Sequence, residues 1–206
     1  MRTNFFPYFV AITVCLGWMA IVLSRMLIIP FLPVIEEEFN VTHAQAALLM
    51  SSYFLPYAVI QLPAGLISDK FENRFLMILA MLGVLLGCLL INFTSSFNQV
   101  LIVRFLTGVL AGLWFTSSFK AITEYANRNR LGLVLGLGYT GSSIGSVLIY
   151  VLAGIASSIG MTWRSLFAIS SIPSFFCILL ICVLMKKAKK KRRDSNEESI
   201  NRKVNR

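Results

Sequence analysis

The chain has 206 residues, of which 57% are hydrophobic and 14% charged, and its mean hydropathy is +0.76. Because a soluble domain carries about 25% charged residues, this composition excludes an ordinary soluble domain and indicates a protein that crosses the lipid bilayer several times. The net charge is +10, but most of it comes from residues 186–206, so the basic character belongs to one tail and does not indicate a nucleic-acid partner.

Six stretches of the chain are long and apolar enough to form transmembrane helices, each of which takes about 20 residues. They cover residues 8–34, 43–68, 74–94, 98–122, 131–157 and 164–185. Short loops join them. We therefore expect an all-α membrane protein in which residues 1–185 form a six-helix bundle and residues 186–206 form a basic, disordered tail.

The basic residues near the predicted helix ends lie mostly on one side of the membrane. Those on this side, besides the tail, are Arg2, Lys70, Arg74, Lys120, Arg128 and Arg130. The other side has Arg164 and the acidic cluster Glu36–Glu38. Since Lys and Arg accumulate in cytoplasmic loops, we predict a multi-pass protein of the cell membrane with both termini in the cytoplasm. The tail would then either contact the anionic inner leaflet or stay solvated.

Arg25 is the only charged residue of the first stretch and lies well inside it. It is about ten residues from the outer end, a depth of about 15 Å, which its side chain cannot span. A buried arginine costs about 2.5–3.5 kcal/mol or more on insertion scales and marks a substrate path or a paired site. Two roles stay open: contact with an anionic substrate, or hydrogen bonds to backbone carbonyls near Pro30 and Pro33.

The second stretch begins with a capping-box pattern, Thr42 followed by Gln45, which predicts the first turn of a helix. His43, the only histidine, lies in this cap, and we assign it no role. Further along, Tyr53, Tyr57 and Gln61 form a polar line at helical spacing. We predict substrate contact for this line, with a membrane-interface position as the alternative for the tyrosines.

A short charged turn, GLISDKFENR, separates the second and third stretches. It resembles the signature G-x-x-x-D-[RK]-x-G-[RK]-[RK] of the major facilitator superfamily. The matching positions are Gly65, Asp69, Lys70 and Arg74. The segments RMLIIPFLPVIEEEF, YAVIQLPAG, RFLTGVLAG and WRSLF resemble the same family in the same order, within residues 20–170. Glu72 replaces the signature glycine and Asn73 a basic residue, so the geometry of this turn is expected to differ.

The resemblance implies one six-helix half of a twelve-helix transporter, built as an inverted 3+3 repeat, with the substrate between the two halves. The partner would be a second six-helix half or a second copy of this chain, because a lone half exposes polar groups to lipid.

The resemblance also implies a latch at the charged turn that stabilises the outward-open state. To this latch we assign Gly65, Asp69, Lys70, Arg74, Arg104 and Glu124. Asp69 is expected to face a helix N-terminus, and Arg74 to pair with Glu124.

The fourth stretch contains two basic residues and a glycine pair. Lys120 resembles a basic position of anion-transporting members of the family, as Arg25 does, and its alternative is to extend to the cytoplasmic surface. Arg104, near the outer end, would anchor the helix at the interface or take the structural or proton-coupling role that the resemblance implies. Gly108 and Gly112 predict close packing against another helix.

In the fifth stretch, polar residues share one narrow face and glycines another. The polar residues are Tyr139, Ser143, Ser146 and Tyr150. We predict that they line the substrate cavity, although serines also bond to their own helix. The glycines, about 120° away, are Gly138, Gly141 and Gly145. We predict that they pack against a neighbouring helix.

We therefore predict a secondary active transporter, a symporter or antiporter, that moves a small solute by alternating access. An organic or inorganic anion is favoured, because no Asp or Glu lies in the middle of a predicted helix. A proton is the candidate coupling ion, through Glu124 or through the other half. The alternative is a non-transporting or truncated membrane subunit with an assembly or regulatory role.

The sequence argues against an enzyme and against a cofactor. GSSIG at residues 141–145 matches G-x-S-x-G, but a nucleophilic serine needs a histidine base, and His43 lies in the predicted cap of the second helix. The four cysteines lie in apolar stretches without the spacing of metal ligands. We expect no catalytic residue, no metal and no cofactor.

Overall fold

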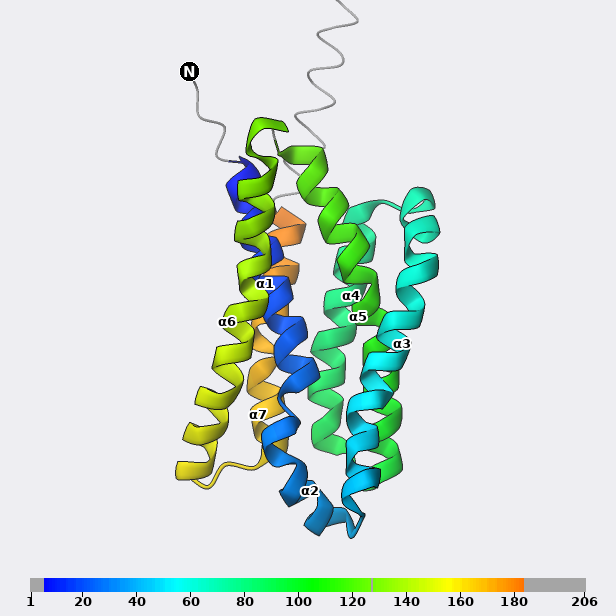
Figure 1. Ribbon diagram of the computed structural model, residues 1–206, viewed down its shortest axis with the longest axis vertical. Helices are drawn as coiled ribbons and strands as arrows, with labels where there is room; N and C mark the ends of the chain where they lie inside the picture. The colour runs from blue at the N-terminus through cyan, green and yellow to red at the C-terminus, as the bar shows by residue number, and fades with distance from the viewer. Residues whose placement is uncertain (1–5, 127, 184–206) are drawn as a thin grey trace, which may run out of the picture.

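The computed structural model describes residues 6–126 and 128–183, and the regular elements in these ranges are all helices (Figure 1). They are α1 Phe6–Met26, η1 Ile29–Phe31, α2 Leu32–Phe39, α3 His43–Lys70, α4 Asn73–Leu90, η2 Ile91–Phe93, α5 Phe97–Tyr125, η3 Arg128–Arg130, α6 Leu131–Ser158 and α7 Trp163–Ser170. After a turn at Ser171 the last helix continues over residues 172–183. The predicted tail, residues 186–206, lies outside the described residues.

Six helical segments are long and apolar enough to cross a membrane. They run over Pro7–Phe39, His43–Lys70, Asn73–Phe93, Phe97–Tyr125, Arg128–Ser158 and Trp163–Val183. The predicted number of spans and the all-α fold class are confirmed, and the predicted bounds of the second to fifth spans lie close to the observed ones.

The first span differs from the single helix predicted over residues 8–34. It breaks after Met26, passes through the 3₁₀ turn η1 and resumes as α2. Pro30 causes the break, because a proline ring clashes with the carbonyl four residues earlier, which here belongs to Met26. The span then continues to Phe39 and ends at Asn40, which is in the left-handed conformation with φ 50°.

The capping box predicted at the start of the second span is present. The backbone N–H of Gln45 donates to Thr42 Oγ1 at 3.3 Å, and the backbone N–H of Thr42 donates to Gln45 Oε1 at 2.9 Å. These two bonds satisfy N–H groups that have no partner inside the helix. The cap thus fixes where α3 begins after the turn at Asn40.

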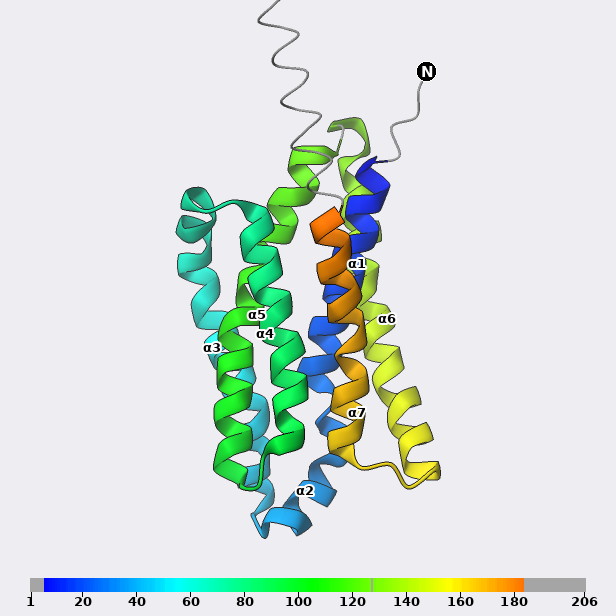
Figure 2. The ribbon, with the colours of Figure 1, turned by 180° about the vertical axis from the view of Figure 1, so that it is seen from behind.

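Four helices form one broad face of the bundle. In Figure 1, α6, α1 and α3 lie toward the viewer, together with the half of α5 that ends at Tyr125. We call this surface the front face. In the reverse view, α4 and α7 lie toward the viewer (Figure 2). The polar and aromatic residues singled out from the sequence belong mainly to the front-face helices.

The helix pairing has the symmetry of two related triplets of spans. The most extensive contacts are between α1 and α6, between α3 and α5, and between α4 and α5. Exchanging the first three spans with the last three turns the α1–α6 pair into the α5–α3 pair. This relation is the one expected for a 3+3 repeat.

Glycines allow the two main pairs to approach closely. A Cβ added to Gly141 of α6 would lie 1.8 Å from the carbonyl oxygen of Cys15 on α1. A Cβ added to Gly108 of α5 would lie 2.4 Å from the carbonyl oxygen of Tyr53 on α3. The packing predicted for the two glycine faces is therefore confirmed, since backbones this close leave no room for a side chain.

One end of the bundle, which we call the Glu38 end, is held by a cluster of polar contacts. The indole N–H of Trp163 donates to Glu38 Oε2 at 2.8 Å, and Arg164 forms an ion pair with the same carboxylate. Arg164 also donates to the carbonyl of Thr94 at 3.3 Å. These contacts join α2, the α4–α5 connection and the start of α7. The opposite end, which carries Phe6, is the amino end.

Candidate substrate-binding face

Arg104 is the most deeply buried cation of the described residues, with 1% of its surface exposed. Its guanidinium donates from Nε to the carbonyl of Leu49 at 2.6 Å and from Nη2 to that of Arg25 at 2.8 Å. A weaker bond runs from Nη1 to the carbonyl of Ser24 at 3.4 Å. The three acceptors lie on α1 and α3, so Arg104 joins three helices.

The broken first span explains why Arg104 is buried. Carbonyls in the last turn of a helix lose their intrahelical donors, and those of Ser24 and Arg25 belong to the last turn of α1. Arg104 supplies donors to both carbonyls. The sequence-based alternative in which Arg104 anchors at the membrane interface is wrong, because the side chain faces the bundle interior and not its surface.

The side chain of Arg25 has a different environment from that of Arg104, although Arg104 donates to the backbone carbonyl of Arg25. Its guanidinium carbon lies 4.7 Å from the centre of the Phe54 ring and 5.6 Å from that of Tyr57, both on α3. Its Nε is buried and makes no hydrogen bond with any described residue. Cation–π contact stabilises the charge by about 0.5–2 kcal/mol but leaves the N–H donors unsatisfied.

One of the two roles weighed for Arg25 is taken by Arg104 in the structure. Hydrogen bonds to carbonyls beside the proline break are made by Arg104. In the part of the chain that the structure describes, the contacts of the Arg25 guanidinium are with the rings of Phe54 and Tyr57. Such a group matches an anion, which could accept the N–H donors that the bundle leaves free.

The line predicted on α3 divides between core and surface. Tyr53 is 1% exposed, accepts a hydrogen bond from the Ser24 hydroxyl at 3.2 Å, and stacks on Tyr57 with ring centres 6.3 Å apart. Gln61, two turns further on, is half-buried. Tyr53 therefore supports the α1–α3–α5 contact, whereas Tyr57 is next to Arg25.

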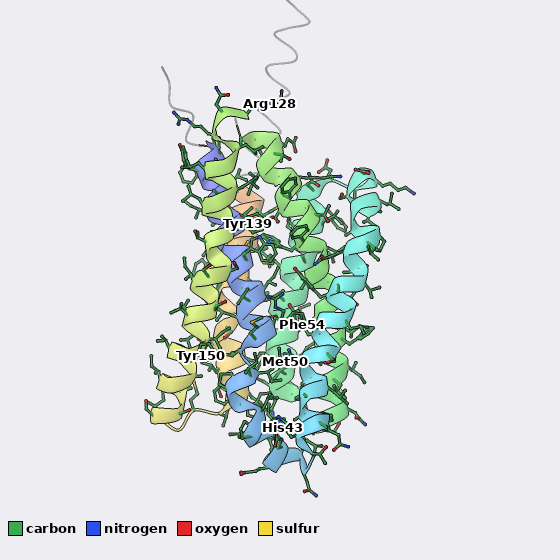
Figure 3. All side chains as sticks on the ribbon, viewed as in Figure 1. His43, Met50, Phe54, Arg128, Tyr139 and Tyr150 are labelled. Carbon is green, nitrogen blue, oxygen red and sulfur yellow. The ribbon has the colours of Figure 1, made fainter. Side chains whose placement is uncertain are left out.

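The line predicted on α6 is mostly exposed. Tyr139 is half-buried, Ser143 and Ser146 are exposed, and Tyr150 is 66% exposed. Figure 3 shows Tyr139 nearer the amino end and Tyr150 further toward the Glu38 end. The ring of Tyr139 contacts a neighbouring helix, since its centre lies 5.3 Å from that of Trp18 on α1.

The charged residues assigned to a latch, except Arg104, lie at the amino end. Lys120 of α5 forms an ion pair with Asp69 of α3, with Nζ and Oδ1 2.5 Å apart. Arg74 at the start of α4 donates to the carbonyl of Cys182 at 3.3 Å. Lys120 was predicted as a substrate contact and Asp69 as part of the latch, and the structure brings these two side chains together.

Of the remaining latch candidates, Gly65, Lys70 and Glu124 are near the same end, and Arg104 is not. Lys70 and Glu124 are exposed, and nothing lies within 4 Å of a Cβ added to Gly65. Arg104 lies elsewhere, because its guanidinium donates to the carbonyls of Leu49, Ser24 and Arg25. It therefore does not belong to the cluster at the amino end.

Three aromatic residues on or beside the front face were not singled out from the sequence. Phe54 lies under the Arg25 guanidinium, and Trp18 lies between Tyr139 and Phe115, whose ring centre is 6.1 Å from its own. Helical spacing could have identified two of them, since Trp18 is seven residues before Arg25 and Phe54 is three before Tyr57, so each shares a helix side with a predicted site residue. Their apolar character gave no reason to separate them from core residues.

No acidic residue balances Arg25 within the described spans. The acidic residues of these spans are Glu36, Glu37, Glu38, Asp69 and Glu124, all close to an end of the bundle. The contacts given above for Glu38 and Asp69 are with Arg164 and Lys120. Within the described spans, Arg25 therefore has aromatic rings beside it and no ion pair.

Comparisons with known proteins give the family. The model described as Major Facilitator Superfamily matches residues 14–205. The probable sulfoacetate transporter SauU of Cupriavidus necator is 26% identical over 84% of this chain and 40% of its own length. The multidrug resistance protein MdtG of Rahnella is 28% identical over 86% of this chain and 43% of its own length.

A solved structure has the same fold. The proton:xylose symporter XylE, bound to 6-bromo-6-deoxy-D-glucose, superposes with a TM-score of 0.77 at 17% identity. The match covers 85% of this chain and 44% of that one. This chain therefore spans less than half the length of each of these three proteins.

Proposed function

Because this chain belongs to the major facilitator superfamily, we propose that it forms one six-helix half of a secondary transporter that moves a small anionic solute by alternating access. The chain is a multi-pass membrane protein, and its family consists of transporters rather than enzymes. We also propose that both termini are cytoplasmic, because basic residues gather at the amino end and Lys and Arg accumulate in cytoplasmic loops.

The observation that carries the anion is the state of Arg25. Its guanidinium rests on Phe54 and Tyr57, and its Nε has no hydrogen-bond partner among the described residues. Aromatic contact offsets only part of the cost of an arginine inside the membrane, which is at least about 2.5–3.5 kcal/mol. A carboxylate, sulfonate or phosphate would accept the free donors and neutralise the charge.

A second six-helix bundle would cover the front face. The most apolar stretch of the α3 span and that of the α6 span are each only 28% buried. The corresponding stretches of the other four spans are 39–61% buried. In Figure 1 these two helices flank α1 and α5. A partner bundle resting on α3 and α6 would enclose the space above Arg25, and it would be another chain or a second copy of this one.

At the amino end, Asp69 and Lys120 would act as a latch of one transport state. Their ion pair joins α3 to α5, and its side chains are 69% and 33% exposed. Exposed pairs contribute about 0–1 kcal/mol, which suits a contact that breaks and forms during a transport cycle. A coupled proton would require a carboxylate such as Glu124 or one from the second bundle.

The test compares Arg25→Ala and Arg25→Lys with a matched control, Arg128→Ala, which removes an exposed arginine at the amino end. Ligand-dependent thermal shifts of the purified full chain are measured over organic anions, cations and sugars, followed by uptake of any anion that binds. We expect Arg25→Ala to lose anion binding and Arg25→Lys to retain part of it. Arg128→Ala should bind anions as well as the unmodified chain does. Binding that is unchanged in Arg25→Ala, or restricted to cations, would contradict the anion proposal.

A further inference from the structure

A second group on the front face has the features of a binding site. Trp18 of α1 packs between Tyr139 of α6, with ring centres 5.3 Å apart, and Phe115 of α5, with ring centres 6.1 Å apart. We call these three side chains the aromatic cluster. It joins helices that are distant in sequence and lies on the side of the bundle where Figure 3 shows Tyr139.

The aromatic cluster is not an ordinary part of the hydrophobic core. Phe115 is 42% exposed and Tyr139 is half-buried, so two of the three rings reach the surface of the bundle. Trp18 is 7% exposed, and its indole N–H has no hydrogen-bond partner among the described residues. A buried tryptophan N–H normally finds an acceptor, so the cluster combines apolar walls with an unused donor.

The aromatic cluster and Arg25 are aligned along one helix. Trp18 and Arg25 are seven residues apart on α1, which is close to two full turns, so both side chains emerge from the same side of the helix. Seven residues correspond to about 10.5 Å along the axis. In Figure 3, Tyr139 from the cluster and Phe54 from the Arg25 site lie at different heights, with Tyr139 nearer the amino end.

From this arrangement we infer that the aromatic cluster is a second subsite for the same solute, and that the substrate class is an amphipathic organic anion. The anionic group would bind at Arg25, and an aryl or short alkyl group would lie against Trp18, Phe115 and Tyr139. The inference rests on the proposed anion site and adds the apolar half of the substrate.

The experiment measures dissociation constants calorimetrically for the full chain in lipid nanodiscs. The probes are 4-phenylbutyrate, butyrate, which lacks only the ring, and 4-phenylbutanol, which lacks only the charge. The variants are Tyr139→Ala, Phe115→Leu and Arg25→Ala. The control is Phe176→Ala, which removes an aromatic ring that is 53% exposed on the last span, on the other side of the bundle (Figure 2).

We expect the unmodified chain to bind 4-phenylbutyrate at least tenfold more tightly than butyrate. Tyr139→Ala and Phe115→Leu should reduce this ratio to less than threefold without weakening butyrate binding, and Phe176→Ala should retain it. Phe115→Leu keeps an apolar side chain of similar bulk, so it decides the question if Tyr139→Ala does not fold. No preference for the ring in the unmodified chain, or an unchanged ratio in both cluster variants, would overturn the inference.

The two proposals fail in different ways. If butyrate binds equally well to Arg25→Ala and to the unmodified chain, the anion site is wrong. Ring-dependent binding of 4-phenylbutanol that Tyr139→Ala abolishes would then still support the aromatic cluster as a site. If butyrate binding depends on Arg25 but the ring adds no affinity, only the second subsite is wrong.

Discussion

Replacing Arg104 with methionine tests the reasoning about the broken first span. Methionine keeps much of the volume and apolar contact of the side chain but donates no hydrogen bond. The carbonyls of Leu49 and Arg25 would lose donors at 2.6 and 2.8 Å, and that of Ser24 a weaker one at 3.4 Å. Hydrogen bonds to a charged group contribute about 1.5–3 kcal/mol each.

Counting only the two short bonds, and taking the lower value because hydrogen bonds inside membranes are weak, the loss is about 3 kcal/mol. For a chain of this size, 1 kcal/mol shifts the melting temperature by about 2–4 °C, so the expected decrease is about 6–12 °C. Arg104→Lys keeps the charge but reaches fewer acceptors, so its melting temperature should be intermediate.

The assay is thermal unfolding of the purified protein in one detergent, with Arg128→Ala as the control for removal of an exposed arginine. An Arg104→Met protein that melts within about 2 °C of the unmodified one would refute the idea that Arg104 stabilises the end of α1. The same result with transport lost would assign Arg104 to the transport cycle and not to the fold.

Three further predictions concern packing, the latch and the helix cap. Gly141→Ala should prevent the close approach of α1 and α6 and lower the melting temperature, since its Cβ would lie 1.8 Å from the Cys15 carbonyl. Gly154→Ala, on the same helix, meets nothing within 4 Å, so its melting temperature should be unchanged or higher. Asp69→Asn should lower uptake while changing stability by less than about 1 kcal/mol, and exchanging the charges with Asp69→Lys and Lys120→Asp should recover part of the uptake; equal uptake in Asp69→Asn would argue against a latch. Thr42→Ala should destabilise the protein by about 1 kcal/mol through loss of the α3 cap, measured against Ser95→Ala in the α4–α5 connection; no difference between the two would mean that the capping box contributes nothing.

Much of the fold followed from local patterns in the sequence. Apolar runs predicted the six spans, the Thr42–Gln45 pair predicted the start of α3, and glycine spacing predicted the close helix contacts. Each of these depends on residues within a few turns of one another. The shape of the first span could not be predicted in the same way. Pro30 acts locally, but a proline either kinks or breaks a helix. Which of the two occurs depends on whether another helix can satisfy the freed carbonyls.

The candidate site was only partly predictable. Arg25, Tyr57 and Tyr139 were identified from charge and periodicity, and the structure places each beside a residue from another helix. The aromatic partners Phe54, Trp18 and Phe115 were missed, because an apolar ring in a membrane helix has the same local pattern whether it faces lipid, core or a binding site.

The sequence by itself determined that the chain is a six-span helical membrane protein and where most helices begin and end, because hydropathy, caps and glycine spacing act over short distances. Only the tertiary structure decided which of two arginines bonds to backbone carbonyls and which has an Nε without a hydrogen-bond partner among the described residues. Arg104 and Arg25 are both long cations in apolar helices, and they differ only in the carbonyls and rings that other helices bring within reach. That contact depends on how α1, α3 and α5 pack, and no property of a single helix specifies it.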